Sequence, residues 1–259
     1  MNGNLKLVKF CMIEQIRLIE IELFSYCNRT CSFCPNSFID RKSTNKIMDI
    51  DIFESLINEL SELNYSNYIS FSRYNEPLSH RDILEDRIKY IRKILPKVTI
   101  VANTNGDYSW ENIDIDELTV MDYDNNKNRE NLGTFFNKAN PKIVRKMKLG
   151  KINNRAGALD IKGNFVRNVP CYEPKYFVGI DYTGDVVPCC NIRHDVSIHK
   201  PYILGNLNDI SLSNILMSIK ANKFREDVSN KIFPKICKGC SKMPGRYTAD
   251  KPSIGNKVS

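Results

Sequence analysis

The sequence of 259 residues lacks any run of 18 or more uncharged apolar residues, so no segment is expected to span a membrane. Charged side chains such as Lys6, Lys9 and Glu14 interrupt the apolar positions between Met1 and Glu22, which leaves no core for a signal peptide. There is no low-complexity tract and no repeat at the period of solenoid proteins. These absences, with 42% hydrophobic and 26% charged residues, indicate an ordinary soluble globular protein of the cytoplasm.

The net charge of the chain is +8, which is moderate. Such a charge would favour an anionic substrate or the acidic surface of an electron donor, but it does not indicate binding to nucleic acid. The length suffices for a sizeable core in one large domain or two smaller ones.

Nine cysteines in a sequence without a secretion signal favour metal or redox chemistry in a reducing cytosol over a disulfide framework. Cys27, Cys31 and Cys34 are separated by three and two residues, so one loop can wrap all three around a metal centre. A closed structural site needs four protein ligands. Three thiolates therefore either borrow a distant fourth ligand, as in a zinc knuckle, or leave one metal position open for a small molecule. The open arrangement is a catalytic one.

From the N-terminus to about Ile161 the sequence alternates between predicted strands and helices, which is typical of a parallel α/β sheet. The expected strands are 18–24, 68–72, 98–102 and 119–121, with two weaker ones at 143–144 and 159–161. Helices are expected at 52–63 (capped by Asp49 or Asp51), at 80–95 (ended by Pro96) and at 110–118. The polar stretch 122–130 is expected to be an exposed loop. The cysteine loop then leaves the C-terminal end of the first strand, where such sheets bind ligands.

The C-terminal third contains a second group of cysteines. Cys171 and Cys189 flank a predicted hairpin over 178–187, and the pair Cys237 and Cys240 follows much later. A helix is expected near 212–219. Four thiolates in this order predict a metal cage, for which both zinc and an iron–sulfur cluster are chemically possible.

The spacing of the first three cysteines resembles that of the radical S-adenosylmethionine (SAM) enzymes. The resemblance implies that Cys27, Cys31 and Cys34 hold three irons of a [4Fe–4S] cluster and that SAM chelates the fourth iron. It also implies a fold, a partial (β/α)6 TIM-like barrel over residues 1–163, since five or six β/α units are too few to close an eight-stranded barrel.

The loops after the cysteines also resemble SAM-binding loops of this family. Phe33 stands before the third cysteine, where the family's residue lies near the adenine. Tyr74-Asn75-Glu76-Pro77 occupies the place of a GGE-like motif for the SAM amino group, although Asn75 replaces a usual glycine. Thr104 and Asn105 resemble the T-N-G turn that faces the ribose or methionine end of SAM.

The second cysteine group resembles the opening of the SPASM domain motif, and no cysteine follows Cys240. This departure from a complete SPASM domain implies the truncated form called Twitch, over residues 164–259, with one auxiliary [4Fe–4S] cluster. Its implied ligands are Cys171, Cys189, Cys237 and Cys240. Cys190 is the alternative to Cys189, which the Gly-x4-Cys spacing favours. Cys11 is expected to be a small buried apolar residue.

Within this family, the chain is most similar to members that oxidise an alcohol on a sugar or cyclitol. The resemblance includes Asn154-Arg155-Ala156-Gly157 and implies that Arg155 contacts the substrate. Arg155 could also be a base, although arginine is effectively always protonated. The alternatives are binding of a phosphate or carboxylate, or a salt bridge at the domain junction.

The mechanism implied by the resemblance begins with an electron from a flavodoxin- or ferredoxin-like donor. SAM is then cleaved to methionine and a 5′-deoxyadenosyl radical, which removes hydrogen from a substrate C–H bond. If that carbon bears a hydroxyl, loss of a proton and of a second electron to the auxiliary cluster gives a ketone. The protein orients the reacting carbon and excludes water.

Two other functions stay open at this stage. The substrate could be a ribosomally made peptide, although the short segment before Cys27 leaves little room for a leader-recognition domain. A non-enzymatic zinc or electron-transfer protein would leave the open three-cysteine site without a purpose. The sequence does not name the substrate, but a basic cluster could face a phosphorylated or nucleotide-linked sugar; its members are Lys142, Arg145, Lys146, Lys148 and Lys151.

Overall fold

The computed structural model describes residues 3–123, 143–148, 153–161 and 165–240. Its helices are α1 (Gly3–Gln15), α2 (Ile50–Glu62), α3 (Arg81–Ile94), α5 (Glu173–Tyr176), α6 (Leu212–Met217), α7 (Ile219–Ser229) and α8 (Lys235–Lys238), with 3-10 turns η1 (Pro35–Ser37), η2 (Pro77–His80) and η3 (Ser197–Tyr202). Its strands are β1 (Leu18–Ile21), β2 (Tyr68–Ser70), β3 (Thr99–Thr104), β4 (Glu117–Asp122), β5 (Ile143–Lys148), β6 (Phe177–Ile180), β7 (Asp185–Val187) and β8 (Gly205–Asn206). Among the described residues, no helix is long and apolar enough to cross a membrane.

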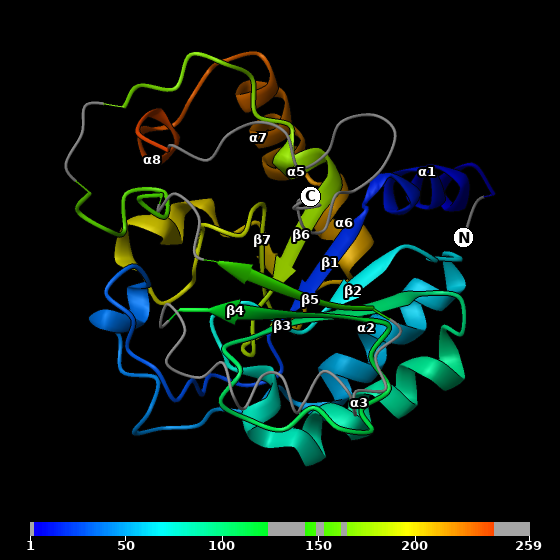
Figure 1. The fold of residues 1–259 in the computed structure, drawn as a ribbon. Helices are drawn as coiled ribbons and strands as arrows, with labels where there is room; N and C mark the ends of the chain where they lie inside the picture. The colour runs from blue at the N-terminus through cyan, green and yellow to red at the C-terminus, as the bar shows by residue number, and fades with distance from the viewer. Residues whose placement is uncertain (1–2, 124–142, 149–152, 162–164, 241–259) are drawn as a thin grey trace.

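The strands form one eight-stranded sheet in the order β5-β4-β3-β2-β1-β6-β7-β8. Neighbours from β5 to β6 pair in parallel, and β6, β7 and β8 pair antiparallel. The six parallel strands confirm the partial (β/α)6 barrel expected from the sequence. Figure 1 shows α2 and α3 side by side along the outer face of this sheet.

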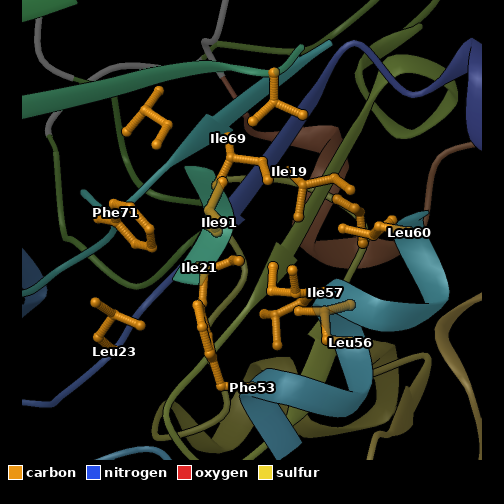
Figure 2. Packing of buried hydrophobic residues seen from close by; sticks show 14 of the residues in the cluster. Ile19, Ile21, Leu23, Phe53, Leu56, Ile57, Leu60, Ile69, Phe71 and Ile91 are labelled. Carbon is orange, nitrogen blue, oxygen red and sulfur yellow. The ribbon is translucent and has the colours of Figure 1, made fainter. Parts of the chain in front are cut away.

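Short apolar stretches account for the strands and the helices that cover them. Ile19 and Ile21 of β1 are fully buried, and α2 turns Phe53, Leu56 and Ile57 toward them (Figure 2). Burial of each such side chain contributes about 1.5–3 kcal/mol. Asp49 caps α2 by accepting a hydrogen bond from the backbone of residue 51, one of the two caps expected.

The prediction of a helix at 110–118 is wrong. Residues 110–116 run in an extended path into β4, with Ile113 and Ile115 buried and alternating with two aspartates. Asn112 has a φ of +58°, which a helix does not accommodate, and the Asp116 carboxylate accepts a hydrogen bond from the backbone of Ile100.

The strand expected at 159–161 is also wrong, because these residues follow a turn and lie at the surface. The sixth parallel strand is β6, which the sequence assigned to the C-terminal hairpin. That hairpin exists, with Gly184 at a φ of +86° in its turn, and its first strand pairs with β1 along Leu18–Ile21. The sheet therefore continues across the domain boundary expected at 163/164.

The observed helices and strands test several further predictions from the sequence. The strands expected at 18–24, 68–72, 98–102, 119–121 and 143–144 and the helices at 52–63, 80–95 and 212–219 are all present, with shifted ends. The loop expected at 122–130 lies outside the described residues beyond Tyr123. Helix α1 was not expected, and its Cys11 is exposed, which corrects the prediction that it is buried.

Candidate functional site

The loop that follows β1 brings Cys27, Cys31 and Cys34 to the wall of a cavity of about 260 Å³. The backbone N–H of Cys27 donates to the carbonyl of Arg41 at 3.1 Å, and that of Cys34 donates to the carbonyl of Cys31 at 2.9 Å. The cavity lies at the C-terminal ends of the parallel strands, because residues that end or follow β2, β3 and β4 also line it. The sequence placed the cysteines at this edge correctly.

The three thiols interact with one another electrostatically. Burial raises the pKa of Cys27 to about 11, and the charges of Glu76, Cys34 and Cys31 raise it further against a hydrogen bond from the Arg29 backbone. A bound metal reverses this effect, since coordination keeps a thiol deprotonated. Three thiolates crowded in this way repel one another unless a cation lies between them.

The donor set bears on which metal group fits. Among the described residues, no three His, Cys, Asp or Glu side chains gather closely enough to hold a single metal ion. Three thiols on one loop beside a cavity are a donor set that fits an iron–sulfur cluster with one open position.

The segment after β2 places Glu76 across from the turn after β3. Its carboxylate accepts hydrogen bonds from the Thr104 hydroxyl at 2.7 Å and from the Asn105 backbone at 2.8 Å. Burial raises the pKa of Glu76 to about 7, although these hydrogen bonds oppose the shift. The two loops that the sequence selected for SAM are therefore joined by one buried carboxylate.

Further contacts connect this turn to the cysteine loop. Asn105 donates from Nδ2 to Asn28 at 2.8 Å, and Arg29 pairs with Asp107 through two hydrogen bonds of 2.6 and 2.5 Å. Gly106 between them has a φ of +79°, a conformation that favours glycine. Hydrogen bonds from Arg29 and Asn28 hold the pKa of Asp107 below its usual value, although burial raises it.

Tyr74 and Asn75 also line the cavity, as the sequence predicted. The Tyr74 hydroxyl donates to the carbonyl of Cys190 at 2.8 Å, and the guanidinium of Arg193 stacks 4.0 Å from the centre of its ring. Asn75 accepts a hydrogen bond from the backbone of Arg73, while its Nδ2 is buried with no partner among the described residues. A buried amide donor without a partner is costly, so it marks a place for a ligand acceptor.

Phe33 lines the same cavity, with its ring 5.1 Å from that of Tyr123. The guanidinium of Arg29 lies 5.8 Å from the Tyr123 ring. Tyr123 directly follows β4 and was not selected from the sequence, although the rule that strand ends carry ligand contacts applied to it as well.

Arg155 reaches the cavity from a strained turn. Arg155, Ala156 and Gly157 have φ values of +48°, +53° and +84°, and the Ala156 carbonyl is held by His199 at 3.1 Å. Non-glycine residues in this conformation cost roughly 1–3 kcal/mol each and cluster at functional sites. The strain aims a nearly buried guanidinium at the space beside the cysteine loop.

The Arg155 side chain has weak contacts for a buried cation. Within the described residues it donates a long hydrogen bond of 3.4 Å to Asn191, and its Nε is buried without a partner there. The Tyr74 ring lies 5.9 Å away. Burial lowers its pKa, but Tyr74, Cys190 and Cys34 raise it overall, so the guanidinium stays protonated and offers N–H donors to the cavity.

Arg73 is a cavity residue that the sequence reasoning missed. It stands immediately before Tyr74 and pairs with Glu20 at 3.4 Å while donating to the carbonyl of Ile192 at 2.9 Å. Its position between a strand end and a selected motif was the available signal. Of the basic cluster expected to face the substrate, Lys142 and Lys151 lie outside the described residues, and Arg145, Lys146 and Lys148 belong to β5.

The four cysteines of the C-terminal group lie on three segments that meet. Cys189 and Cys237 pack in one apolar cluster with Val187, Ile192 and Ile236. Burial raises the pKa of Cys237 to about 12, with Cys240 and Cys171 adding to the shift and Arg167 opposing it. The Cys240 sulfur accepts weak hydrogen bonds from Asn191 at 3.6 Å and Arg167 at 3.9 Å.

Cys189 and its neighbour Cys190 point to different places. Cys189 belongs to the apolar cluster around Cys237, whereas Cys190 lines the cavity and its thiol lies 3.9 Å from the Glu173 carboxylate. Cys189 therefore lies with the C-terminal cysteine group, whereas Cys190 lies at the cavity that the first cysteine group lines.

Comparisons with known proteins agree with this geometry. Residues 21–117 match the model of the radical SAM superfamily, and residues 171–241 match the SPASM iron–sulfur cluster-binding domain. The chain therefore contains a radical SAM domain followed by a SPASM domain. It is a radical SAM enzyme whose cofactors are SAM and iron–sulfur clusters.

The chain is also similar to one further protein in sequence and to two solved structures in fold. The chain is 28% identical over 246 residues to the S-adenosyl-L-methionine-dependent 2-deoxy-scyllo-inosamine dehydrogenase of Niallia circulans, covering 90% of this chain and 95% of that protein. Its fold is similar to the crystal structure of BtrN in complex with AdoMet and 2-DOIA, with a TM-score of 0.73, 24% identity and coverage of 87% and 93% of the two chains. An open conformation of BtrN is similar with a TM-score of 0.63, 24% identity and coverage of 87% and 92%.

Proposed function

We propose that this enzyme oxidises a secondary alcohol of a sugar or cyclitol to a ketone. The observation that carries the proposal is a single cavity shared by three cluster-type thiols and by Arg155, a buried donor whose Nε has no partner among the described residues. The dehydrogenase of Niallia circulans, a relative along nearly its full length, supports this substrate class.

In this proposal Cys27, Cys31 and Cys34 hold a [4Fe–4S] cluster, and SAM lies between it and the ends of β2 and β3. Phe33 contacts the adenine, while Tyr74, Asn75 and Glu76 surround the amino group and Thr104 and Asn105 face the ribose or methionine end. The Asn75 Nδ2 and the remaining lone pairs of Glu76 supply a donor and acceptors at this place.

The auxiliary [4Fe–4S] cluster is proposed to be held by Cys171, Cys189, Cys237 and Cys240 in a Twitch unit within residues 164–259, whose strand β6 also completes the parallel sheet of the barrel. The packing of Cys189 beside Cys237 supports Cys189 over Cys190 as the ligand. Arg167 and Asn191 direct N–H groups at the Cys240 sulfur, which suits a thiolate.

When bound, the clusters and SAM supply one-electron cleavage of SAM and an acceptor for the second substrate electron. The chain's own residues orient the alcohol. Arg155 stays protonated and donates to the substrate oxygen, so it stabilises negative charge as the hydroxyl loses its proton. The walls formed by Tyr74, Tyr123 and the strand ends shield the reacting carbon from bulk solvent. The electron enters from a flavodoxin- or ferredoxin-like donor in this proposal.

The proposal is tested with anaerobically reconstituted enzyme, dithionite and SAM. A panel of cyclitols and sugars deuterated at carbinol carbons is screened for deuterium in 5′-deoxyadenosine and for a product lighter by two hydrogens. The expected result is coupled formation of both products with about eight irons per chain. A peptide that alone stimulates 5′-deoxyadenosine formation would replace the alcohol dehydrogenase with a peptide maturase.

A further inference from the structure

Two surface stretches carry three of the four C-terminal cysteines. Residues 165–175 contain Cys171, and residues 231–240 contain Cys237 and Cys240. The stretches lie side by side, because the backbone N–H of Arg167 donates to the carbonyl of Lys238 at 2.8 Å. Gly239 likewise lies against the Phe165 carbonyl. We call their joint exposed surface the auxiliary face.

The auxiliary face carries several exposed apolar side chains. Phe165, Val166, Val169 and Tyr172 have exposed fractions of 43, 72, 38 and 44%, and Ile232 reaches 61%. Single exposed apolar residues are normal, but a group of them on two paired stretches marks an interaction site. Val169 and Tyr172 flank Cys171 closely in the chain, so a partner seated here would come close to the thiolates.

The charges on the auxiliary face have one sign. Lys231, Lys235 and Lys238 are exposed, and Lys175 lies over the Tyr172 ring at 5.4 Å. Glu173 is the one acidic residue in the two stretches, and its side chain is buried. Apolar side chains and exposed lysines on the same two stretches complement a partner whose contact surface combines apolar and acidic side chains.

We propose that the auxiliary face docks an acidic one-electron carrier protein of the flavodoxin or ferredoxin class. This inference rests on the proposed function, in which an electron must leave the auxiliary cluster. The substrate first loses a hydrogen atom to the 5′-deoxyadenosyl radical. The resulting carbon radical then releases its hydroxyl proton to water and one electron to the oxidised auxiliary cluster, which forms the ketone. The reduced cluster passes that electron to the oxidised carrier.

Docking is tested with holoenzyme and a purified acidic flavodoxin, without SAM or substrate. Binding is measured by biolayer interferometry, and electron exchange by stopped-flow absorbance of the flavin. The variant K235E/K238E reverses two exposed charges on the auxiliary face. The matched control K93E/K97E changes the net charge equally at exposed lysines at the end of α3 and in the turn after it.

In low salt we expect K235E/K238E to weaken flavodoxin binding and slow electron exchange by about tenfold or more, since steering by charge reaches 10- to 1,000-fold. K93E/K97E should stay within about twofold of wild type, and the difference should shrink in high salt as charges are screened. SAM cleavage driven by dithionite, which needs no docking, should be unchanged in both variants.

Wild-type binding and exchange rates in K235E/K238E would overturn the proposal and leave the alcohol oxidation intact. So would a dimer, seen by light scattering, that only this variant dissociates, because the face would then belong to a second copy of the chain. A wild-type holoenzyme with about four irons in place of eight would instead remove the auxiliary cluster and with it the proposed function.

Discussion

The two cysteine groups of this molecule are built on different principles. Cys27, Cys31 and Cys34 share one loop that is tied down by polar contacts, among them the Arg29–Asp107 pair, and they face an open cavity. The C-terminal cysteines come from segments that are far apart in the chain, and two of them, Cys189 and Cys237, pack among apolar side chains. An open site on one loop suits chemistry, and a closed site among apolar neighbours suits storage of an electron.

A buried ionic network connects the two regions. Arg41, whose carbonyl holds the backbone of Cys27, pairs with Glu22 at 3.2 Å and with Asp195 at 2.7 Å. Asp195 also pairs with Arg193, which stacks on Tyr74. The positive charges of Arg193 and Arg41 hold the pKa of Asp195 well below its usual value, although burial raises it. The network ties the segment that follows the first cysteine group to the segment that follows Cys189 and Cys190.

The largest expected effect is a contrast between single substitutions in the two cysteine groups. C34A should abolish SAM cleavage and reduce the iron content from about eight to about four per chain. C240A should lose the same amount of iron but keep SAM cleavage, because the open site is intact, and ketone formation should disappear. Iron analysis, 5′-deoxyadenosine and product assays on the same preparations measure the contrast.

The neighbours Cys189 and Cys190 provide the matched control for that contrast. C189S should lose the auxiliary cluster, whereas C190S should keep about eight irons. If C190S loses iron and C189S does not, the ligand assignment is reversed.

The second effect concerns the donor in the cavity. R155A removes a hydrogen-bond donor to the substrate oxygen, so turnover of the alcohol should fall about 100- to 1,000-fold. R155K keeps the charge without the fork of N–H groups and should fall between R155A and wild type. Uncoupled SAM cleavage without substrate should be unaffected in both. An equal loss of uncoupled cleavage would show that Arg155 supports SAM rather than the substrate.

Local patterns were enough to predict the catalytic half of the molecule. The cysteine spacing and the apolar strands that precede Glu76 and end at Thr104 are contiguous signals, and each can be located from its own stretch of sequence. The sequence missed the partnership between these loops, because hydrogen bonds such as Thr104 to Glu76 join residues 28 positions apart. Arg155 was selected only through the family resemblance, because a φ of +48° at an arginine cannot be predicted from local sequence.

The errors in the predicted secondary structure have two causes. One hydrophobic period was misread as helical, and one strand was assigned to the hairpin alone. Ile113-Asp114-Ile115-Asp116 alternates in steps of two, and its spacing from Trp110 imitates a helical face. Strand β6 was assigned to the hairpin alone, although it also completes the parallel sheet beside β1. Pairing with a strand near the opposite end of the chain is a tertiary choice that local propensity does not express.

The third effect is a dependence of stability on pH. The pKa of Glu76 is raised by burial to about 7 from the ordinary 4.5, so the folded protein holds this proton more tightly than the unfolded chain. The stabilisation is complete below pH 4.5 and is lost as the pH rises through 7. A difference of 2.5 pKa units corresponds to at most about 3 kcal/mol.

Urea unfolding of protein before reconstitution measures this dependence. From pH 4.5 to 8, the free energy of unfolding of wild type should fall by up to about 3 kcal/mol more than that of E76Q. E62Q, at an exposed position at the end of α2, should follow wild type. Parallel curves for wild type and E76Q would place the proton on another group.

The smallest effect tests the tie between the cysteine loop and the turn after β3. D107N removes the charge that Arg29 grips with two hydrogen bonds, at a pair that is partly exposed, with side-chain exposures of 18 and 24%. An exposed ion pair contributes at most about 1 kcal/mol, so the melting temperature should barely change. SAM affinity should nevertheless drop several-fold, because Asn28 and Arg29 belong to the loop that carries the cysteines. D86N breaks an exposed pair on α3 as the control and should leave SAM affinity unchanged. If D107N binds SAM as tightly as D86N does, the rigidity of the open site comes from the buried Glu76 contacts alone, and the polar tie at its rim is only a surface salt bridge.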